Sequence, residues 1–187
     1  MPPVTSADYL ARLQRVLAAI DAAAIDRALD VIEAAWKRDA QILTLGNGGS
    51  ALTAIHFATD WSKGVFGATG RPFRVRSLVD NVGVVTAYGN DLSYADVFLG
   101  QLQGSLRPGD LVIAISGSGN SENVIRAIDY ANAHGAETLG LCGYRGGRLK
   151  EKARHVVWAD VDDMQLCEDV HSIFGHIAMQ RFCSAGA

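Results

Sequence analysis

The chain has 187 residues, of which 49% are hydrophobic and 7% aromatic, and this suits one domain with a sizeable core. A formal net charge of −3 argues against general electrostatic attraction to nucleic acids or acidic membranes, so neither is expected as a partner. The start of the chain lacks the features of a secretory signal, and no run of about 18 apolar residues predicts a membrane span. These features favour a soluble cytoplasmic protein.

Residues 6–38 are predicted to be helical, because apolar side chains recur there at helical spacing. Ser6 is the expected N-cap, and Asp21 restarts the pattern. A helical segment that precedes the first strand stands outside an alternating strand–helix unit. It can pack across its own domain or against another copy of the chain, and periodicity favours neither.

From residue 41 onward, short apolar runs alternate with helical segments. Strands are predicted at 41–45, 73–78, 111–115, 138–142 and 156–159. Helices are predicted from about residue 50 to 63, over 82–106 with an interruption at 89–91, over 121–134, near 149–153 and over 164–182. This order predicts the α/β class: a three-layer sandwich with a central parallel sheet flanked by helices, and an N-terminal helical extension. A ligand is expected at the carboxyl ends of the strands.

The three cysteines, Cys142, Cys167 and Cys183, are odd in number and match no zinc-binding spacing. We predict that they are small buried side chains in a reducing compartment.

Two loops rich in glycine and serine follow predicted strands. The first is Gly46-Asn47-Gly48-Gly49-Ser50, where glycines permit positive φ and let a ligand approach the backbone. A helix that starts at Ser50 would direct free N–H groups and the positive end of its dipole at an anion. The second is Ser116-Gly117-Ser118-Gly119-Asn120-Ser121, in which Ser121 is a natural N-cap.

Neither loop has the glycine spacing of a dinucleotide-binding turn, and neither has the lysine of a Walker A loop. One glycine-rich turn alone often serves only as a connection. Two hydroxyl-bearing turns at equivalent strand ends are a stronger signal. They predict a site for a small phosphomonoester in a chain that has no basic patch.

The segments GNGGSALTAIHFATD and ISGSGNSENVIRAI resemble the two signature segments of SIS (sugar isomerase) domain proteins, in particular the phosphoheptose (sedoheptulose 7-phosphate) isomerase family. The resemblance covers nearly the whole chain and implies a single SIS domain over residues 1–187. It implies that serines of both loops hold the phosphate while asparagines shape the turns. The phosphate-binding residues predicted in this way are Asn47, Gly48, Ser50, Ser116, Gly117, Ser118, Asn120 and Ser121.

Candidate acid and base groups lie on two predicted helices. His56 and Asp60 are four residues apart and share a helix face, and the last helix carries Glu168, His171 and His176. Aldose–ketose isomerisation needs a base that moves a proton between C1 and C2 and an acid that serves the adjacent oxygens. A carboxylate and an imidazole suit these roles.

The family resemblance implies specific roles for these residues. Asp60 stands where the family has its glutamate base, and His176 stands where it has its histidine acid. The resemblance also implies one divalent metal, typically zinc, with His56, Asp60, Glu168 and His176 as ligands, and two imidazoles with two carboxylates suit zinc. Glu168 is further predicted to contact the substrate.

Three departures from the family pattern leave the heptose assignment open. Asp60 replaces a glutamate and is one methylene shorter. Glu168 replaces a glutamine, and its charge should favour protonated His176 or strengthen metal binding. A basic residue of the family is not matched in register, and Lys63 is the nearest substitute. These changes leave the phosphate site intact but allow another ketose phosphate as substrate.

Each candidate also has a plainer interpretation. His56 and Asp60 can be a surface pair, Glu168 a solvated residue, His171 a packing residue and His176 a core histidine. His134 and His155 belong to no cluster and are predicted to be surface residues. Asn90 and Asp91 resemble a family segment near the sugar, and Asp80 is either a helix cap or a sugar ligand.

The leading hypothesis is an isomerase that converts sedoheptulose 7-phosphate to D-glycero-D-manno-heptose 7-phosphate through an enediol(ate). The alternative is a non-catalytic phosphosugar-binding module, because a close relative of the family binds the replication initiator protein. The resemblance further implies a homotetramer that assembles through residues 6–38, with sites built from more than one subunit.

Overall fold

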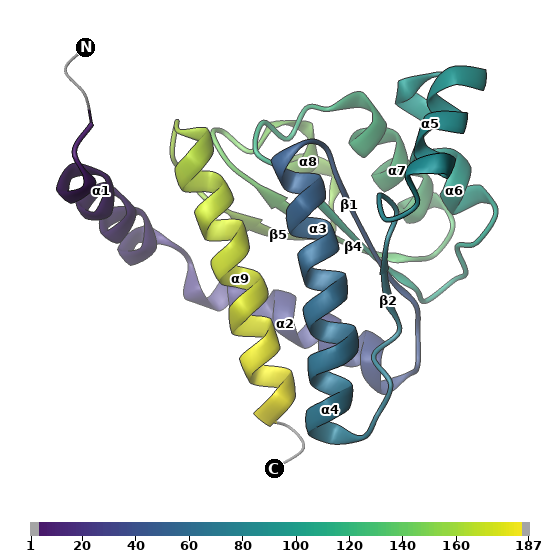
Figure 1. The fold of residues 1–187 in the computed structure, drawn as a ribbon, viewed down its shortest axis with the longest axis horizontal. Coiled ribbons are helices and arrows are strands. Elements are labelled where there is room, and N and C mark those ends of the chain that lie inside the picture. Colours follow the sequence, from purple (N-terminus) through teal and green to yellow (C-terminus); the bar gives the residue numbers. More distant parts are fainter. Residues whose placement is uncertain (1–3, 185–187) are drawn as a thin grey trace.

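The computed structural model describes residues 4–184, which form one five-stranded parallel sheet with helices on both faces (Figure 1). The strands are β1 (Ile42–Gly46), β2 (Val75–Ser77), β3 (Leu111–Ser116), β4 (Glu137–Cys142) and β5 (His155–Trp158). The helices are α1 (Ser6–Ala19), α2 (Ala22–Lys37), α3 (Gly49–Asp60), α4 (Phe66–Thr69), α5 (Val82–Asp91), α6 (Leu99–Gln103), α7 (Glu122–Ala133), α8 (Gly147–Lys152) and α9 (Met164–Ser184). The predicted three-layer α/β architecture is confirmed.

Two apolar cores cover the two faces of the sheet, because successive strand side chains point to opposite sides. Ile42 and Ile113 contribute to the core under α2, α3 and α9. Leu43 and Val112 contribute to the core under α6, α7 and α8. Both faces of the sheet are therefore covered by helices and shielded from water, which explains why the strand sequences are continuous apolar runs.

The strand order β2-β1-β3-β4-β5 sets the position of the two loops. The chain passes from β1 to β2 on one side and then returns to place β3 on the other side of β1. Gly46 at the end of β1 is paired in register with Ile115 near the end of β3. The two Gly/Ser loops thus leave neighbouring strands where the winding direction reverses, which is where open α/β sheets bind ligands.

The N-cap of α1 is Thr5 rather than Ser6, so that part of the sequence prediction is wrong. The Thr5 hydroxyl accepts a hydrogen bond from the Asp8 backbone N–H at 3.1 Å, and the Asp8 carboxylate accepts one from the Thr5 backbone N–H at 3.4 Å. This reciprocal pairing satisfies more backbone donors than a cap at Ser6 would.

The helix after the first loop also differs from the prediction. It starts at Gly49, one residue before Ser50, and continues beyond Asp60 as a π-helical turn, Trp61–Val65, and then as α4. The left-handed Gly70, with φ of 68°, ends it. Asp60 therefore occupies the junction of α-helix and π-turn, a kind of irregularity that is frequent at functional sites.

Two further predicted elements are shorter in the structure. The strand predicted at 73–78 keeps only β2, an edge strand that pairs with β1 alone. The helix predicted over 82–106 is divided into α5, a 3₁₀ turn at Tyr94–Asp96 and α6. Ser93 begins that turn and donates to Asp96 at 2.6 Å, which replaces helical hydrogen bonding there.

The two N-terminal helices pack differently. α2 buries five residues, among them Leu29, Ile32 and Trp36, so it belongs to the intrachain core. α1 buries none and extends from the body of the domain (Figure 1). It is tied to the domain by an ion pair between Arg12 and Asp163 and by a 2.7 Å hydrogen bond from the Tyr9 hydroxyl to Asp169.

All three cysteines are free thiols. Cys142 and Cys167 are buried as predicted, and Cys183 is half-buried. Among the helices of residues 4–184, none combines the length and apolarity needed to cross a bilayer.

Candidate active site

The first loop turns sharply between β1 and α3. A Cβ on Gly46 would lie 2.8 Å from the backbone carbonyl of Ser50 and 2.9 Å from that of Ile115, so only glycine fits. Gly48 has a φ of 54°, which glycine adopts at little cost. The turn carries Ser50 into the first turn of α3, where its side chain is buried.

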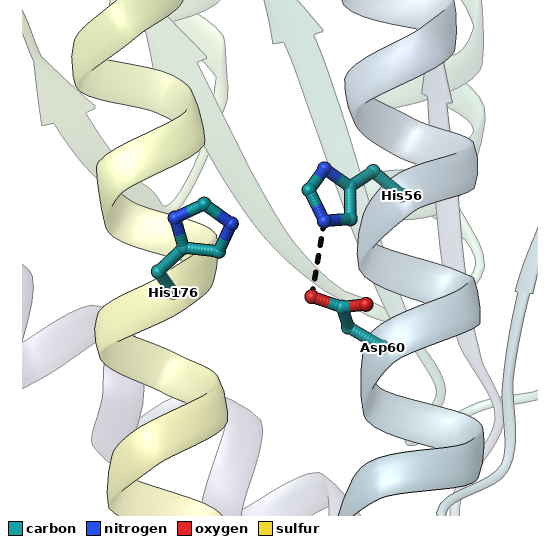
Figure 2. A group of neighbouring side chains, drawn as sticks. All are labelled: His56, Asp60 and His176. Carbon is teal, nitrogen blue, oxygen red and sulfur yellow. Dashed lines mark ion pairs between the residues drawn. The ribbon is translucent and has the colours of Figure 1, made fainter.

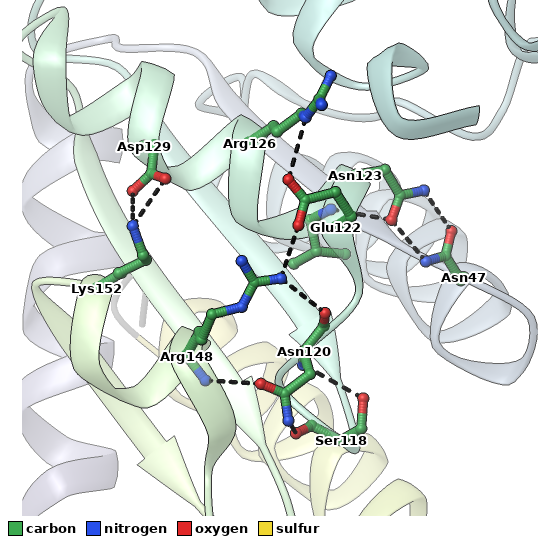
Figure 3. Close-up of polar contacts among 10 residues, drawn as sticks. Asn47, Ser118, Asn120, Glu122, Asn123, Arg126, Asp129, Arg148 and Lys152 are labelled. Atoms are coloured by element: carbon green, nitrogen blue, oxygen red, sulfur yellow. Dashed lines mark hydrogen bonds and ion pairs between the residues drawn. The ribbon is translucent and has the colours of Figure 1, made fainter. Parts of the chain in front are cut away.

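The second loop is held by its own serine and asparagine side chains. The Ser116 hydroxyl accepts from the Gly119 N–H at 3.2 Å, and the Ser118 hydroxyl accepts from the Asn120 N–H at 3.3 Å. The Asn120 side chain accepts from the Arg148 backbone N–H at 3.1 Å and so joins the loop to α8 (Figure 3). The predicted role of Asn120 in shaping the turn agrees with these contacts.

Ser121 occupies the N-cap position of α7, as predicted, but its side chain makes no capping hydrogen bond. Within residues 4–184, the hydroxyls of Ser50 and Ser121 have no intramolecular hydrogen-bond partner. Both hydroxyls are thus free to contact a ligand. Gly119, with φ of 65°, lies so close to the carbonyl of Gly146 that a side chain has no room there.

Sequence reasoning missed Asn123, which joins the two loops. The Asn47 and Asn123 amides donate to each other's oxygen at 2.9 Å in both directions (Figure 3), and the Tyr94 hydroxyl also donates to Asn47 at 2.9 Å. Asn123 is 2% exposed. The sequence feature that could have pointed to Asn123 is its position as a polar residue inside the second signature segment, directly before the apolar pair Val124 and Ile125.

His56, Asp60 and His176 come together between α3 and α9 (Figure 2). Nε2 of His56 lies 3.0 Å from Oδ2 of Asp60, and the centroids of the two imidazole rings are 5.2 Å apart. One ligand atom from each of the three residues lies within 4.8 Å of the others. The side chains of His56 and Asp60 are 48% and 34% exposed, so the group is open to solvent.

Close packing of α3 on α9 brings these residues together. A Cβ on Gly175 would overlap the ring of Phe57, so this glycine lets the two helices approach. The indole of Trp61 donates to the Gly175 carbonyl at 3.1 Å, and this bond is buried. His176, the next residue, is consequently held opposite His56.

The group suits a transition metal. Two imidazoles and a carboxylate with an open fourth position are the donor set of catalytic zinc sites. Within residues 4–184 this is the single cluster of three or more His, Cys, Asp or Glu side chains arranged to hold a metal. The residues present therefore fit the predicted divalent ion.

Glu168 lies apart from this group. It is eight residues before His176, about 12 Å along α9 at 1.5 Å per residue. Its carboxylate packs against Gly49 at the start of α3, where a Cβ would come 2.5 Å from Oε1. The structure thus places Glu168 beside the first loop, and its predicted roles in contacting the substrate and as a fourth metal ligand both remain predictions.

His171 is fully buried, and neither ring nitrogen has a hydrogen-bond partner. Burial lowers its pKa to about 4, a shift that the backbone of Cys142 opposes only in part. A neutral imidazole enclosed in this way matches the packing interpretation of His171. His134 is exposed, whereas His155 is half-buried and lies 3.1 Å from Glu137.

The remaining candidates lie on and before α5. Asn90 and Asp91 are exposed at its end and share a 2.9 Å hydrogen bond with each other. Asp80 is not the cap of this helix, because the side chain of Asn81 accepts from the Val84 N–H at 3.1 Å. Sugar contacts for Asn90, Asp91 and Asp80 remain predictions.

The fold and the site define a doubly wound α/β domain with two Gly/Ser loops at its switch point and a His/Asp group between α3 and α9. Residues 7–143 match the SIS domain family. The chain is 35% identical over 171 residues to a phosphoheptose isomerase of Chlorobium phaeobacteroides, covering 90% of this chain and 76% of that protein. It is 36% identical over 148 residues to a probable phosphoheptose isomerase of Thermoplasma acidophilum, covering 79% of this chain and 81% of that protein.

The fold gives the same result. The structure of a phosphoheptose isomerase from Neisseria gonorrhoeae matches with a TM-score of 0.87 and 27% identity, over 95% of this chain and 96% of that one. The chain therefore belongs to the SIS domain family and, within it, to the phosphoheptose isomerases. The resemblance inferred from the two signature segments is confirmed.

Proposed function

We propose that this protein is an aldose–ketose isomerase of sugar phosphates, with sedoheptulose 7-phosphate as substrate and D-glycero-D-manno-heptose 7-phosphate as product. The observation that carries the proposal is the group formed by His56 and Asp60, on the helix that leaves the first loop, and His176 on α9. His56 is six residues from Ser50, about 9 Å along α3 at 1.5 Å per residue. This spacing suits a sugar with its phosphate at one end and its carbonyl at the other.

The loops bind the phosphate end of the sugar. The free hydroxyls of Ser50 and Ser121 and those of Ser116 and Ser118 donate to phosphate oxygens, and the N-terminus of α3 adds its backbone N–H groups. Asn47 and Asn123 keep the two loops at a constant separation. No cationic side chain is needed in this arrangement.

Asp60 is the base and His176 the acid. Oδ2 of Asp60 contacts His56, which leaves Oδ1 to accept the proton from C1 of the ketose and return it to C2. His176 donates a proton to the C2 oxygen and recovers one from the C1 oxygen, so that atoms and charge balance over the cycle. In this way the carbonyl moves from C2 to C1 through an enediol(ate).

The metal would be held by His56, Asp60 and His176. Glu168, the proposed fourth ligand, would have to leave Gly49 and turn toward His176, which is about 12 Å away along α9. When bound, a divalent ion such as zinc polarises the sugar oxygens as a Lewis acid. The charge of Glu168 would strengthen metal binding relative to a glutamine at this position.

Assembly into a homotetramer through residues 6–38 is part of the proposal. α1 buries no residue in its own chain, and Leu10 is 58% exposed. His56 and His176 also lie open, so a neighbouring subunit has room to complete the site. Light scattering should give a tetramer mass for the natural chain and a smaller mass for Leu10→Asp with Leu17→Asp. A natural chain that is monomeric at micromolar concentration would refute shared sites.

The isomerase is tested with purified protein and sedoheptulose 7-phosphate, with formation of the aldose as the readout. Asp60→Asn and His176→Ala should each abolish turnover while sugar phosphate still binds. Asp129→Asn and His134→Ala, which change exposed residues outside the site and outside residues 6–38, should keep wild-type rates. Binding without conversion across a panel of ketose phosphates would support the regulatory module instead. A cytoplasmic location remains a prediction from the sequence.

A further inference from the structure

A large cavity lies at the opposite end of the sheet from the two Gly/Ser loops. Its volume is about 670 Å³, and it is lined by residues 38–41, by the start of β2 and by the connection 103–110 that leads into β3. Backbone hydrogen bonds from Ile42 to Arg74 and from Leu111 to Gln41 align these segments at the amino ends of three neighbouring strands. None of the residues assigned above to phosphate, sugar or metal lines it.

Arginine dominates the lining of this cavity, which we call the arginine cavity. Four arginines line it, Arg38, Arg74, Arg76 and Arg107, against two acidic residues, Asp39 and Asp110. The formal charge of these side chains is therefore 4 − 2 = +2, although the whole chain carries −3. The lining of the cavity is therefore positively charged, although the chain as a whole is negatively charged.

The two carboxylates are already engaged. Asp110 is buried, and its oxygens accept from the backbone N–H groups of Gln41 at 2.9 Å and Arg107 at 2.8 Å. Asp39 pairs with Arg74 at 3.2 Å. Within residues 4–184, three of the four guanidinium groups therefore have no carboxylate partner.

These three guanidinium groups have donors to spare. Arg38 directs two nitrogens at the Gly109 carbonyl, at 2.9 and 2.7 Å. Arg76 donates one nitrogen to the Ser105 hydroxyl at 3.0 Å, while its buried Nε has no partner. The Arg107 guanidinium makes no hydrogen bond within residues 4–184. A buried donor on a charged group is costly to leave unpaired, so the charge of Arg76 favours an anion nearby.

We propose that the arginine cavity is a second binding site, for a small molecule that carries two or more phosphate groups. A guanidinium group can bind two phosphate oxygens at once through two parallel N–H donors. Three guanidinium groups without carboxylate partners therefore offer more donors than a single phosphate monoester needs. The lining has no aromatic side chain on which a nucleobase would stack, so the ligand is a phosphorylated sugar or a polyphosphate rather than a nucleotide. The site is independent of the isomerase proposal, because it shares no residue with that site.

Inorganic triphosphate is a suitable probe, measured by isothermal titration calorimetry at low salt. The variant Ser50→Ala with Ser121→Ala weakens the phosphate loops without removing an intramolecular hydrogen bond, so the triphosphate binding that it retains reports mainly on the second site. One triphosphate per chain should still bind to it. Adding Arg76→Gln with Arg107→Gln should weaken that binding at least tenfold. Arg107→Gln alone removes no described side-chain contact, and it should weaken binding about threefold in a folded protein.

A charge-matched control separates this site from general attraction. Arg27→Gln with Arg154→Gln removes two exposed arginines that do not line the cavity, and it should leave triphosphate binding unchanged. Equal weakening by this control and by Arg76→Gln with Arg107→Gln would overturn the proposal. So would unchanged binding in both Arg107 variants, or the absence of binding in Ser50→Ala with Ser121→Ala. Isomerase turnover, measured in parallel, reports on the other site alone.

Discussion

The carboxylate of Glu168, on α9, packs against the α-carbon of Gly49 in the first turn of α3. A Cβ on Gly49 would lie 2.5 Å from Oε1 of Glu168, so the contact exists because residue 49 is a glycine. A carboxylate at a helix N-terminus is favoured by the helix dipole. The same place is the proposed cradle for phosphate, and two anions there repel each other.

Glu168→Gln should therefore strengthen the binding of sugar phosphate. Removing one like charge near the phosphate is expected to gain about 1 kcal/mol, or roughly fivefold in Kd. Calorimetry with sedoheptulose 7-phosphate measures the change. Glu151→Gln, which neutralises an exposed residue on α8, should leave Kd unaltered. Unchanged or weaker binding in Glu168→Gln would mean that the carboxylate does not compete with the phosphate.

Asn123→Ala should loosen both loops at once. It removes the two 2.9 Å bonds with Asn47 and leaves a polar group unpaired, at an expected cost of about 1–3 kcal/mol in the free energy of unfolding. KM for the sugar phosphate should rise because the hydroxyls no longer converge. Asn90→Ala removes an exposed amide bonded to Asp91 and should change stability by less than about 0.5 kcal/mol. Equal stability of the two variants would contradict the linking role of Asn123.

Removal of divalent metal by a chelator should lower turnover, and added zinc should restore it. The supporting observation is the convergence of two imidazoles and one carboxylate within 4.8 Å. Metal content measured by mass spectrometry should be one ion per chain, and His56→Gln should weaken metal affinity at least tenfold while His134→Gln does not. Affinity should fall in acid, because protons compete for the ligands. Full activity after complete metal removal would show that the group works without an ion.

His171 should make the protein less stable in acid. Its pKa is lowered to about 4 by burial, whereas an unfolded chain takes up the proton near pH 6.5. Between these pH values the unfolded state binds more protons than the folded state. The contribution of His171 to the free energy of unfolding is therefore fully present above pH 6.5 and falls by about 3 kcal/mol as the pH drops to 4. Urea unfolding at pH 7 and pH 4.5 measures the effect.

His171→Leu provides the matched variant. It fills the same buried space without unpaired nitrogens, so stability at pH 7 should be retained or raised. The free energy of unfolding should then fall less between pH 7 and pH 4.5, because the contribution of His171 is absent. An identical loss of stability in acid for both proteins would assign the effect to other groups.

Local patterns in the sequence sufficed for the sheet and the loops. Continuous apolar runs predicted the buried strands, and the Gly/Ser segments after them predicted tight turns, because both depend on neighbouring residues. Ends of elements were less predictable. Thr5 caps α1 because Asp8 returns a hydrogen bond, and β2 is short because an edge strand pairs on one side only.

The sequence by itself determined that His56 and Asp60 share a face, because a helix brings residues four apart into contact. The family resemblance predicted that His176 meets them, but the tertiary structure decided how it does so, and the tertiary structure alone decided that Asn123 joins the loops. The first depends on the contact of Gly175 with Phe57, and the second on the adjacency of β1 and β3. The placement of Glu168 against Gly49 and the gathering of four arginines at the far end of the sheet were decided in the same way. Such contacts join residues distant in the chain, and helical or strand periodicity carries no information about them.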